Sequence, residues 1–157
     1  MRQTNKISKL RTEIQQTYTD KLLEKRIEIY PSLYKLLSSF TKNIVSQQAI
    51  SLSQLQTLLA EISEWDVNNA VFLSGKAFEL SYRLRTQVIQ LIKAQIDNLQ
   101  NEELLSDLRH KADDVKLALK EDIGIFVVEF PEEQKTFKSF QEIANMVERS
   151  GGGAIVG

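Results

Sequence analysis

The chain contains no cysteine, one histidine and two prolines in 157 residues, and before residue 151 its glycines are isolated. The absence of cysteine excludes disulfides and thiolate metal sites and fits a reducing compartment, so we expect a cytoplasmic protein. A single histidine leaves few of the nucleophile and base pairs that hydrolytic enzymes use. No apolar stretch has the length of a membrane span or a signal peptide. We therefore expect neither a cofactor nor a catalytic centre.

A large net charge is also lacking, since the total is −1, but the charges are unevenly distributed. Residues 1–42 hold nine Lys or Arg and four Asp or Glu, a net charge of +5, and the rest of the chain carries −6. The basic N-terminal arm from Arg2 to Arg11, which also carries Lys6 and Lys9, could dock on an anionic membrane surface or on RNA. The alternative is a solvated helix whose charges complement the acidic remainder of the protein. DNA binding is not expected, because the helix predicted after Asn69 is too apolar to read a groove.

Apolar residues recur at three- and four-residue spacing from Ile7 to Val147, which places them on one face of a helix. With 42% hydrophobic residues, the chain fits one domain that buries about two thirds of the surface of its unfolded state. We predict an all-α bundle of five to six helices, mostly antiparallel, in residues 1–150. A flexible glycine-rich tail should follow in residues 151–157.

The first predicted helix runs from about residue 5 to residue 44. Its N-terminal part has a narrow apolar seam and its C-terminal part a wider one, so we expect the C-terminal part to be more deeply buried. Pro31 lies inside it and predicts a kink or a break, because proline lacks an N–H and clashes with the preceding turn. Tyr30 and Tyr34 share one face and form either an interaction surface or packing at the edge of the core. The narrow seam consists of Ile7, Leu10, Ile14 and Tyr18.

Ser51 and Gln54 match a capping box, so a second helix should begin there. A third helix is predicted over residues 72–99, with apolar residues around about half of its circumference, and we place it at the centre of the bundle. Arg85 falls within this apolar arc, where a guanidinium needs a carboxylate to offset its desolvation. The candidate partners for this structural ion pair are Glu61, Glu64 and Asp66.

A fourth helix is predicted to end at about residue 121, with an apolar seam along one side. Opposite that seam, three acidic residues and the single histidine lie within about 60° of one another. Carboxylates around a histidine can bind a metal or move protons, so this stripe is the candidate site for a metal-dependent or acid/base enzyme. We expect it to be exposed, however, and a di-iron bundle needs a second histidine-bearing helix. The stripe consists of Glu103, Asp107, His110 and Asp114.

Residues 124–130 form the only β-branched apolar run and predict a short extended segment. Such a segment either covers the bundle or offers an edge to another molecule. Pro131 and the two glutamates after it then begin a last helix, which should end near residue 150.

Three segments form a distinctive set: residues 24–34 (EKRIEIYPSLY), Trp65 with VFLS at residues 71–74, and residues 118–124 (ALKEDIG). Together they resemble segments of a loosely defined group of uncharacterised bacterial and phage-associated helical proteins. The resemblance implies an all-helical fold and carries no activity and no site residues. Some members of that group have a hydrophobic N-terminal anchor, which has no counterpart here.

The sequence thus favours a non-enzymatic helical module for protein–protein interaction or scaffolding, with a protein partner or a second copy of itself. Two alternatives stay open. One is an enzyme that uses the acidic stripe, and the other is docking of the basic N-terminal arm on an anionic surface.

Overall fold

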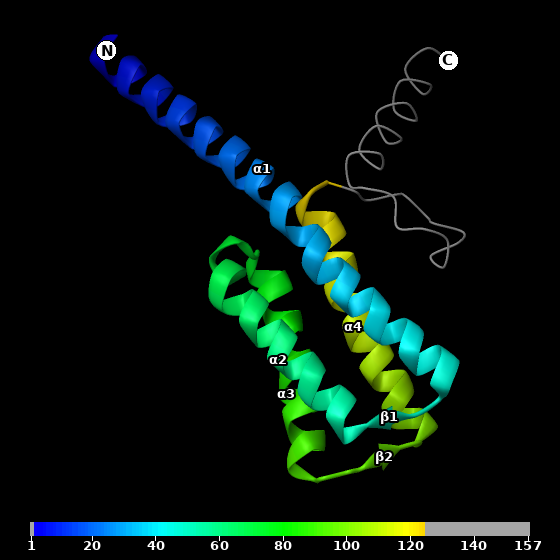
Figure 1. Cartoon of the computed structure of the whole chain (residues 1–157). Coiled ribbons are helices and arrows are strands. Elements are labelled where there is room, and N and C mark those ends of the chain that lie inside the picture. Colours follow the sequence, from blue (N-terminus) through cyan, green and yellow to red (C-terminus); the bar gives the residue numbers. More distant parts are fainter. Residues whose placement is uncertain (1, 125–157) are drawn as a thin grey trace, which may run out of the picture.

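The computed structural model describes residues 2–124, so the predicted extended segment, last helix and glycine-rich tail lie outside the described residues. The described part forms four α-helices, and successive helices run in opposite directions, as in an up-and-down bundle (Figure 1). The all-α prediction is confirmed, with four of the predicted helices in this part of the chain. They are α1 (Arg2–Gln47), α2 (Leu52–Asn69), α3 (Gly75–Lys93) and α4 (Glu102–Asp122), with a short 3-10 turn, η1 (Ala70–Phe72), between α2 and α3.

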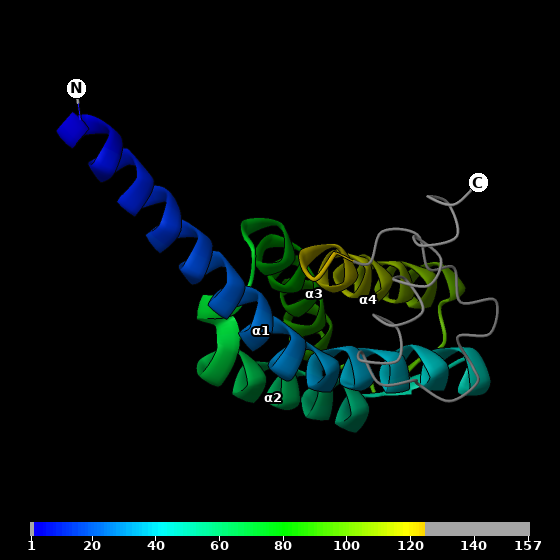
Figure 2. The same cartoon turned by 90° about the horizontal axis from the view of Figure 1, so that it is seen from above.

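The four helices surround one core, because α1 and α3 each pack against both α2 and α4 (Figures 1 and 2). The prediction that the helix near residues 72–99 lies at the centre is therefore wrong. It is shorter than predicted and buries one face, while apolar side chains on the adjoining face stay 37–58% exposed. Those exposed side chains are Phe78, Tyr82 and Ile89. In a bundle of this size each helix has only two neighbours, so none of them is surrounded.

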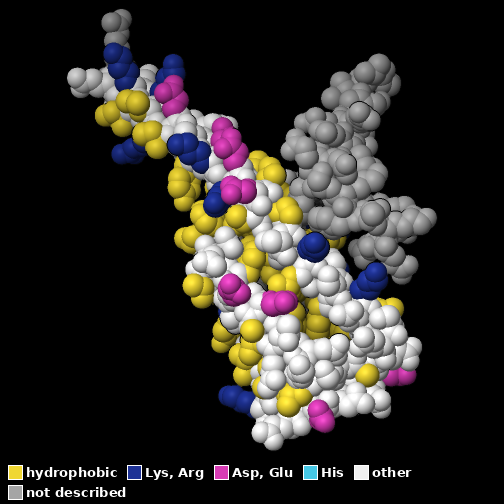
Figure 3. All heavy atoms as spheres, in the orientation of Figure 1, with side chains coloured by type: hydrophobic (Ala, Val, Ile, Leu, Met, Phe, Trp, Pro, Cys, Tyr) yellow, Lys and Arg dark blue, Asp and Glu magenta, His cyan; other side chains and the backbone are white. Residues whose placement is uncertain are grey.

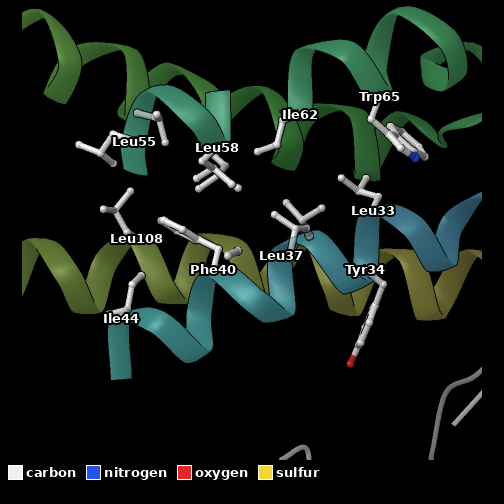
Figure 4. Close-up of a cluster of buried hydrophobic side chains, with 14 of the residues drawn as sticks. Leu33, Tyr34, Leu37, Phe40, Ile44, Leu55, Leu58, Ile62, Trp65 and Leu108 are labelled. Atoms are coloured by element: carbon white, nitrogen blue, oxygen red, sulfur yellow. The ribbon is translucent and has the colours of Figure 1, made fainter. Parts of the chain in front are cut away.

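The core is built from the C-terminal half of α1 and the inner faces of α2, α3 and α4. In Figure 4, Leu33 and Leu37 of α1 point toward α2, whereas Tyr34 points away from it. Close packing of these branched and aromatic side chains supplies most of the stability of such a fold. Labelled core residues in that view include Phe40, Ile44, Leu55, Leu58, Ile62, Trp65 and Leu108.

A two-stranded ribbon closes one end of the bundle. Strands β1 (Ile50–Ser51) and β2 (Asn98–Leu99) pair antiparallel, with Ile50 opposite Leu99, and so tie the loop between α1 and α2 to the loop between α3 and α4. The predicted capping box is confirmed beside it. The Gln54 N–H donates to Ser51 Oγ at 3.1 Å, and the Ser51 N–H donates to Gln54 Oε1 at 2.9 Å.

α1 is one continuous helix of 46 residues that passes through Pro31, so the predicted break at that residue is wrong. Packing of the C-terminal half against α2 and α4 holds the helix together where proline removes a hydrogen bond. The N-terminal half extends beyond the other helices (Figures 1 and 2). We call residues 3–21 the arm, because every side chain in that range is exposed.

Candidate functional site

The acidic stripe of α4 lies on the solvent side of the helix, as predicted. Glu103, Asp107, His110 and Asp114 are all exposed, whereas Leu105 and Leu108 on the other side are buried. Within the described residues, no group of three or more His, Asp or Glu side chains is placed to hold a metal ion.

Side chains of the stripe already bind neighbouring protein groups. Asp107 Oδ2 accepts hydrogen bonds from Lys111 Nζ and Gln87 Nε2, both at 2.6 Å. The ammonium of Lys111 and the amide of Gln87 lower the pKa of Asp107 below its ordinary value. Asp107 is therefore ionised at neutral pH and is a weak base.

His110 is oriented by the preceding turn of its own helix. Its Nδ1 lies 2.7 Å from the Ser106 carbonyl oxygen, and because a carbonyl only accepts, Nδ1 carries the proton. Ser106 Oγ lies 3.3 Å from the same nitrogen, which cannot take the serine proton in this tautomer. An open hollow of about 390 Å³ adjoins these residues, and it lacks the enclosing walls that keep water out of active sites.

The polar contact predicted for Arg85 is present in the structure. Arg85 Nη1 lies 2.5 Å from Asp66 Oδ2, with the two side chains 21% and 9% exposed, whereas Glu61 and Glu64 are exposed. Asp66 Oδ1 and Arg85 Nε have no hydrogen-bond partner in the described structure. Burial raises the pKa of Asp66 and outweighs the opposing effect of Arg85. The pair links α2 to α3.

Tyr30 is fully buried, so of the two alternatives for this tyrosine the packing is confirmed and the interaction surface is wrong. Its hydroxyl donates to Asp122 Oδ2 at 2.8 Å and lies 3.1 Å from the Phe72 carbonyl oxygen, which also accepts from Arg26 Nε at 2.7 Å. Burial and the Asp122 carboxylate raise the pKa of the phenol above its ordinary value of 10.0. Tyr30 therefore joins α1 to the ends of η1 and α4 as a neutral donor.

Tyr34 is only 6% exposed, so its assignment to an interaction surface is wrong as well. The ammonium groups of Lys116 and Lys120 on α4 lie 5.7 and 5.2 Å from the centre of its ring, within the range of cation–π attraction. The pattern of α1 alone shows which residues share a face, but not that α4 covers the face of the tyrosines.

The sequence reasoning missed Lys116, which is 6% exposed. Its ammonium lies 2.9 Å from Asp113 Oδ1 and 3.5 Å from Thr41 Oγ1. Thr41 is 75 residues away in the chain, so no local spacing predicts this contact.

The apolar seam on the arm is an exposed hydrophobic surface of the described structure. The four side chains predicted as a narrow seam do form one, and each is more than half exposed. The exposed fractions are 53% for Ile7, 55% for Leu10, 66% for Ile14 and 69% for Tyr18. In Figure 3 the hydrophobic side chains of the arm gather along its lower edge in the view, on the same side as α2.

No family model, curated protein or solved structure matches this chain. In addition, none of the described helices combines the length and hydrophobicity needed to cross a bilayer. The resemblance to helical bacterial and phage-associated proteins stays an expectation, and function must be inferred from the geometry.

Proposed function

We propose that this protein is a helical protein–protein interaction or scaffold module that binds through the arm of α1. The observation that carries the proposal is the exposed seam of Ile7, Leu10, Ile14 and Tyr18 on a helix that extends away from its own core. The exposed acidic stripe, with its engaged carboxylate and open hollow, offers less support for catalysis.

The physical argument rests on the weakness of isolated helices. Most of the stability of a helix in a protein comes from burying an apolar face against a neighbour, so a helical segment that buries none is weakly held. The arm has an apolar face that no described segment covers. A bound helix or groove that buried this face would stabilise both the arm and the complex.

Photo-crosslinking tests this proposal in cells. A photoreactive amino acid is placed at Ile14 on the seam or, as a matched control, at Gln16, which is also exposed but lies about 160° away around the helix. We expect protein adducts from position 14 and few from position 16. Equal yields at both positions, or none at either, would contradict the proposal.

Docking on an anionic surface is a second candidate, because Lys6 and Arg11 lie on either side of the seam, and both are exposed. Basic and apolar faces on one helix are typical of helices that lie in a membrane interface. Sedimentation with phosphatidylserine vesicles that is lost in high salt would support this candidate. Binding that is unchanged at high salt would contradict this candidate.

A further inference from the structure

We propose that the arm binds the arm of a second copy of this chain, with the two helices antiparallel and the two seams facing each other. This inference rests on the proposed function, because it identifies the occupant of the seam. It is argued from the position of the seam relative to α2, from the charges beside the seam, and from its length.

The seam continues the line along which α1 meets α2 and η1. At about 100° per residue, Ile14 and Tyr18 point in nearly the same direction as Lys25 and Ser32. Further along this line, the Lys25 ammonium lies 5.6 Å from the centre of the Phe72 ring, and Trp65 Nε1 donates to Ser32 Oγ at 2.9 Å. Because α2 ends at Asn69, the arm continues past its intramolecular partner with the same face uncovered by any described residue.

This arrangement excludes a parallel pair. A parallel second α1 lying on the seam would continue, after its own Tyr18, into the space that η1 and α2 occupy beside Lys25 and Ser32. In an antiparallel pair the second helix leads away from η1 after Tyr18, so the two bundles lie at opposite ends of the paired arms. The seam residues then meet in layers, Ile7 with Tyr18 and Leu10 with Ile14 of the second copy.

The charges beside the seam favour the same orientation. Lys6, Glu13 and Asp20 are seven residues apart, so they follow one flank of the seam; all three are exposed, and none forms an ion pair within the described structure. In an antiparallel pair this flank of one helix lies against the same flank of the other. Lys6 of each copy is then opposite Asp20 of the other copy, so the attractive pair forms twice. Glu13 then lies near the two-fold axis opposite Glu13 of the second copy, which is one like-charge contact against the two attractive pairs of Lys6 with Asp20. A parallel pair would instead bring Lys6 beside Arg11, two like charges.

The length of the seam sets the expected strength. Residues 7–18 span about 17 Å of helix, which gives a contact at the small end of stable protein interfaces. The dimer should therefore form and dissociate over an accessible range of concentration, and it should not be permanent.

The first experiment is sedimentation velocity on the full chain from about 1 to about 300 µM, where small interfaces dissociate. We expect the mass to rise from 18.0 kDa toward twice that value. Ile14→Asp should weaken the dimer at least about 30-fold, because two seams lose a central apolar contact. The matched control Gln16→Asp adds the same charge on the opposite face of the arm and should change the dissociation constant less than about threefold. Unchanged circular dichroism would show that both variants fold.

A charge exchange tests the orientation. Lys6→Glu and Asp20→Lys should each weaken the dimer about 2- to 10-fold, since each replaces two attractive pairs by repulsive ones, and the double variant should recover wild-type affinity. In a parallel pair Lys6→Glu would tighten the dimer instead, because Glu would meet Arg11. Tightening, or no recovery in the double variant, would overturn the antiparallel arrangement.

Disulfide crosslinking is an independent test of the orientation. Because the natural chain has no cysteine, each variant carries a single one. A mixture of the Leu10→Cys and Ile14→Cys variants should crosslink faster than either variant alone. If the Leu10→Cys variant alone crosslinks faster than the mixture does, the proposal is overturned.

The failure of this inference can be separated from failure of the proposed function. A chain that stays monomeric at every concentration overturns self-pairing. If Ile14 then crosslinks to a different protein, the interaction function stands without the dimer, and if it crosslinks to nothing, both fail. Monomeric protein that binds phosphatidylserine vesicles through the arm also overturns self-pairing.

Discussion

The two halves of α1 belong to one helix but are held in different ways. In the C-terminal half, Tyr30, Leu33 and Leu37 are at most 1% exposed and contact other helices. In the arm, Leu10 and Ile14 are more than half exposed. Both halves have apolar side chains at helical spacing, so the difference comes from the neighbours that the chain provides, not from the pattern itself. Within the described residues the seam on the arm has no neighbour, and the proposed binding function is argued from this exposed apolar face.

Hydrogen exchange should show the largest contrast between the two halves. Backbone amides of residues 32–44 should exchange only by global unfolding, with a free energy of about 5–15 kcal/mol, whereas arm amides should open at below about 2 kcal/mol. The measurement is made at a concentration low enough to leave the chain monomeric. Arm amides that are as protected as the core amides under these conditions would refute the contrast. Arm protection that increases with protein concentration would show that self-pairing stabilises the arm.

The same substitution in each half should have different energetic effects. Leu33→Ala removes a buried side chain and should lower the free energy of unfolding by about 2–5 kcal/mol. Leu10→Ala removes an exposed one and should change that free energy by less than about 0.5 kcal/mol. Urea unfolding of both variants at low concentration measures the difference. Similar losses would mean that the arm packs against the bundle in solution.

Two tyrosines of α1, one buried and one exposed, allow the two halves to be compared through the loss of a single hydroxyl group. Tyr30→Phe removes the hydroxyl that donates to Asp122 and should lower the free energy of unfolding by about 1.5–3 kcal/mol, as expected for a hydrogen bond to a charged acceptor. Tyr18→Phe changes a side chain that is 69% exposed and should leave the stability unchanged. A neutral result for Tyr30→Phe would show that water replaces the hydroxyl beside Asp122.

The sequence predicted the features that depend only on residues close together in the chain. The all-α class, the capping box at Ser51, the exposed stripe around His110 and the seam on the arm all follow from spacing along one helix. Features that depend on which helices become neighbours were not predictable in this way. Tyr30 contacts Asp122 across 92 residues, and its burial follows from the position of α4. The predicted break at Pro31 is absent for the same reason, because packing on two sides holds α1 continuous.

The residues of the candidate site could also be grouped from local spacing, but their spatial neighbours could not be predicted. Spacing correctly grouped Ile7, Leu10, Ile14 and Tyr18, but the uncovered state of this seam depends on where α2 ends. Arg85 was assigned a carboxylate partner because a guanidinium in an apolar arc needs one. Which of the three carboxylates faces it depends on the rotation of α2 against α3, and only the structure shows that it is Asp66.

The smallest predicted effect compares a buried ion pair with an exposed one. Burial raises the pKa of Asp66 above its ordinary value of 3.8, so the folded state holds this proton more tightly than the unfolded state does. Stability contributed by the protonated carboxyl is therefore lost as pH rises through the folded pKa. Relative to Asp66→Asn, the wild-type protein should lose stability as pH rises above about 4. Glu28→Gln alters a pair with Lys25 whose side chains are 69% and 40% exposed, and it should leave this trend unchanged. The opposite trend would mean that attraction to Arg85 outweighs the desolvation of Asp66.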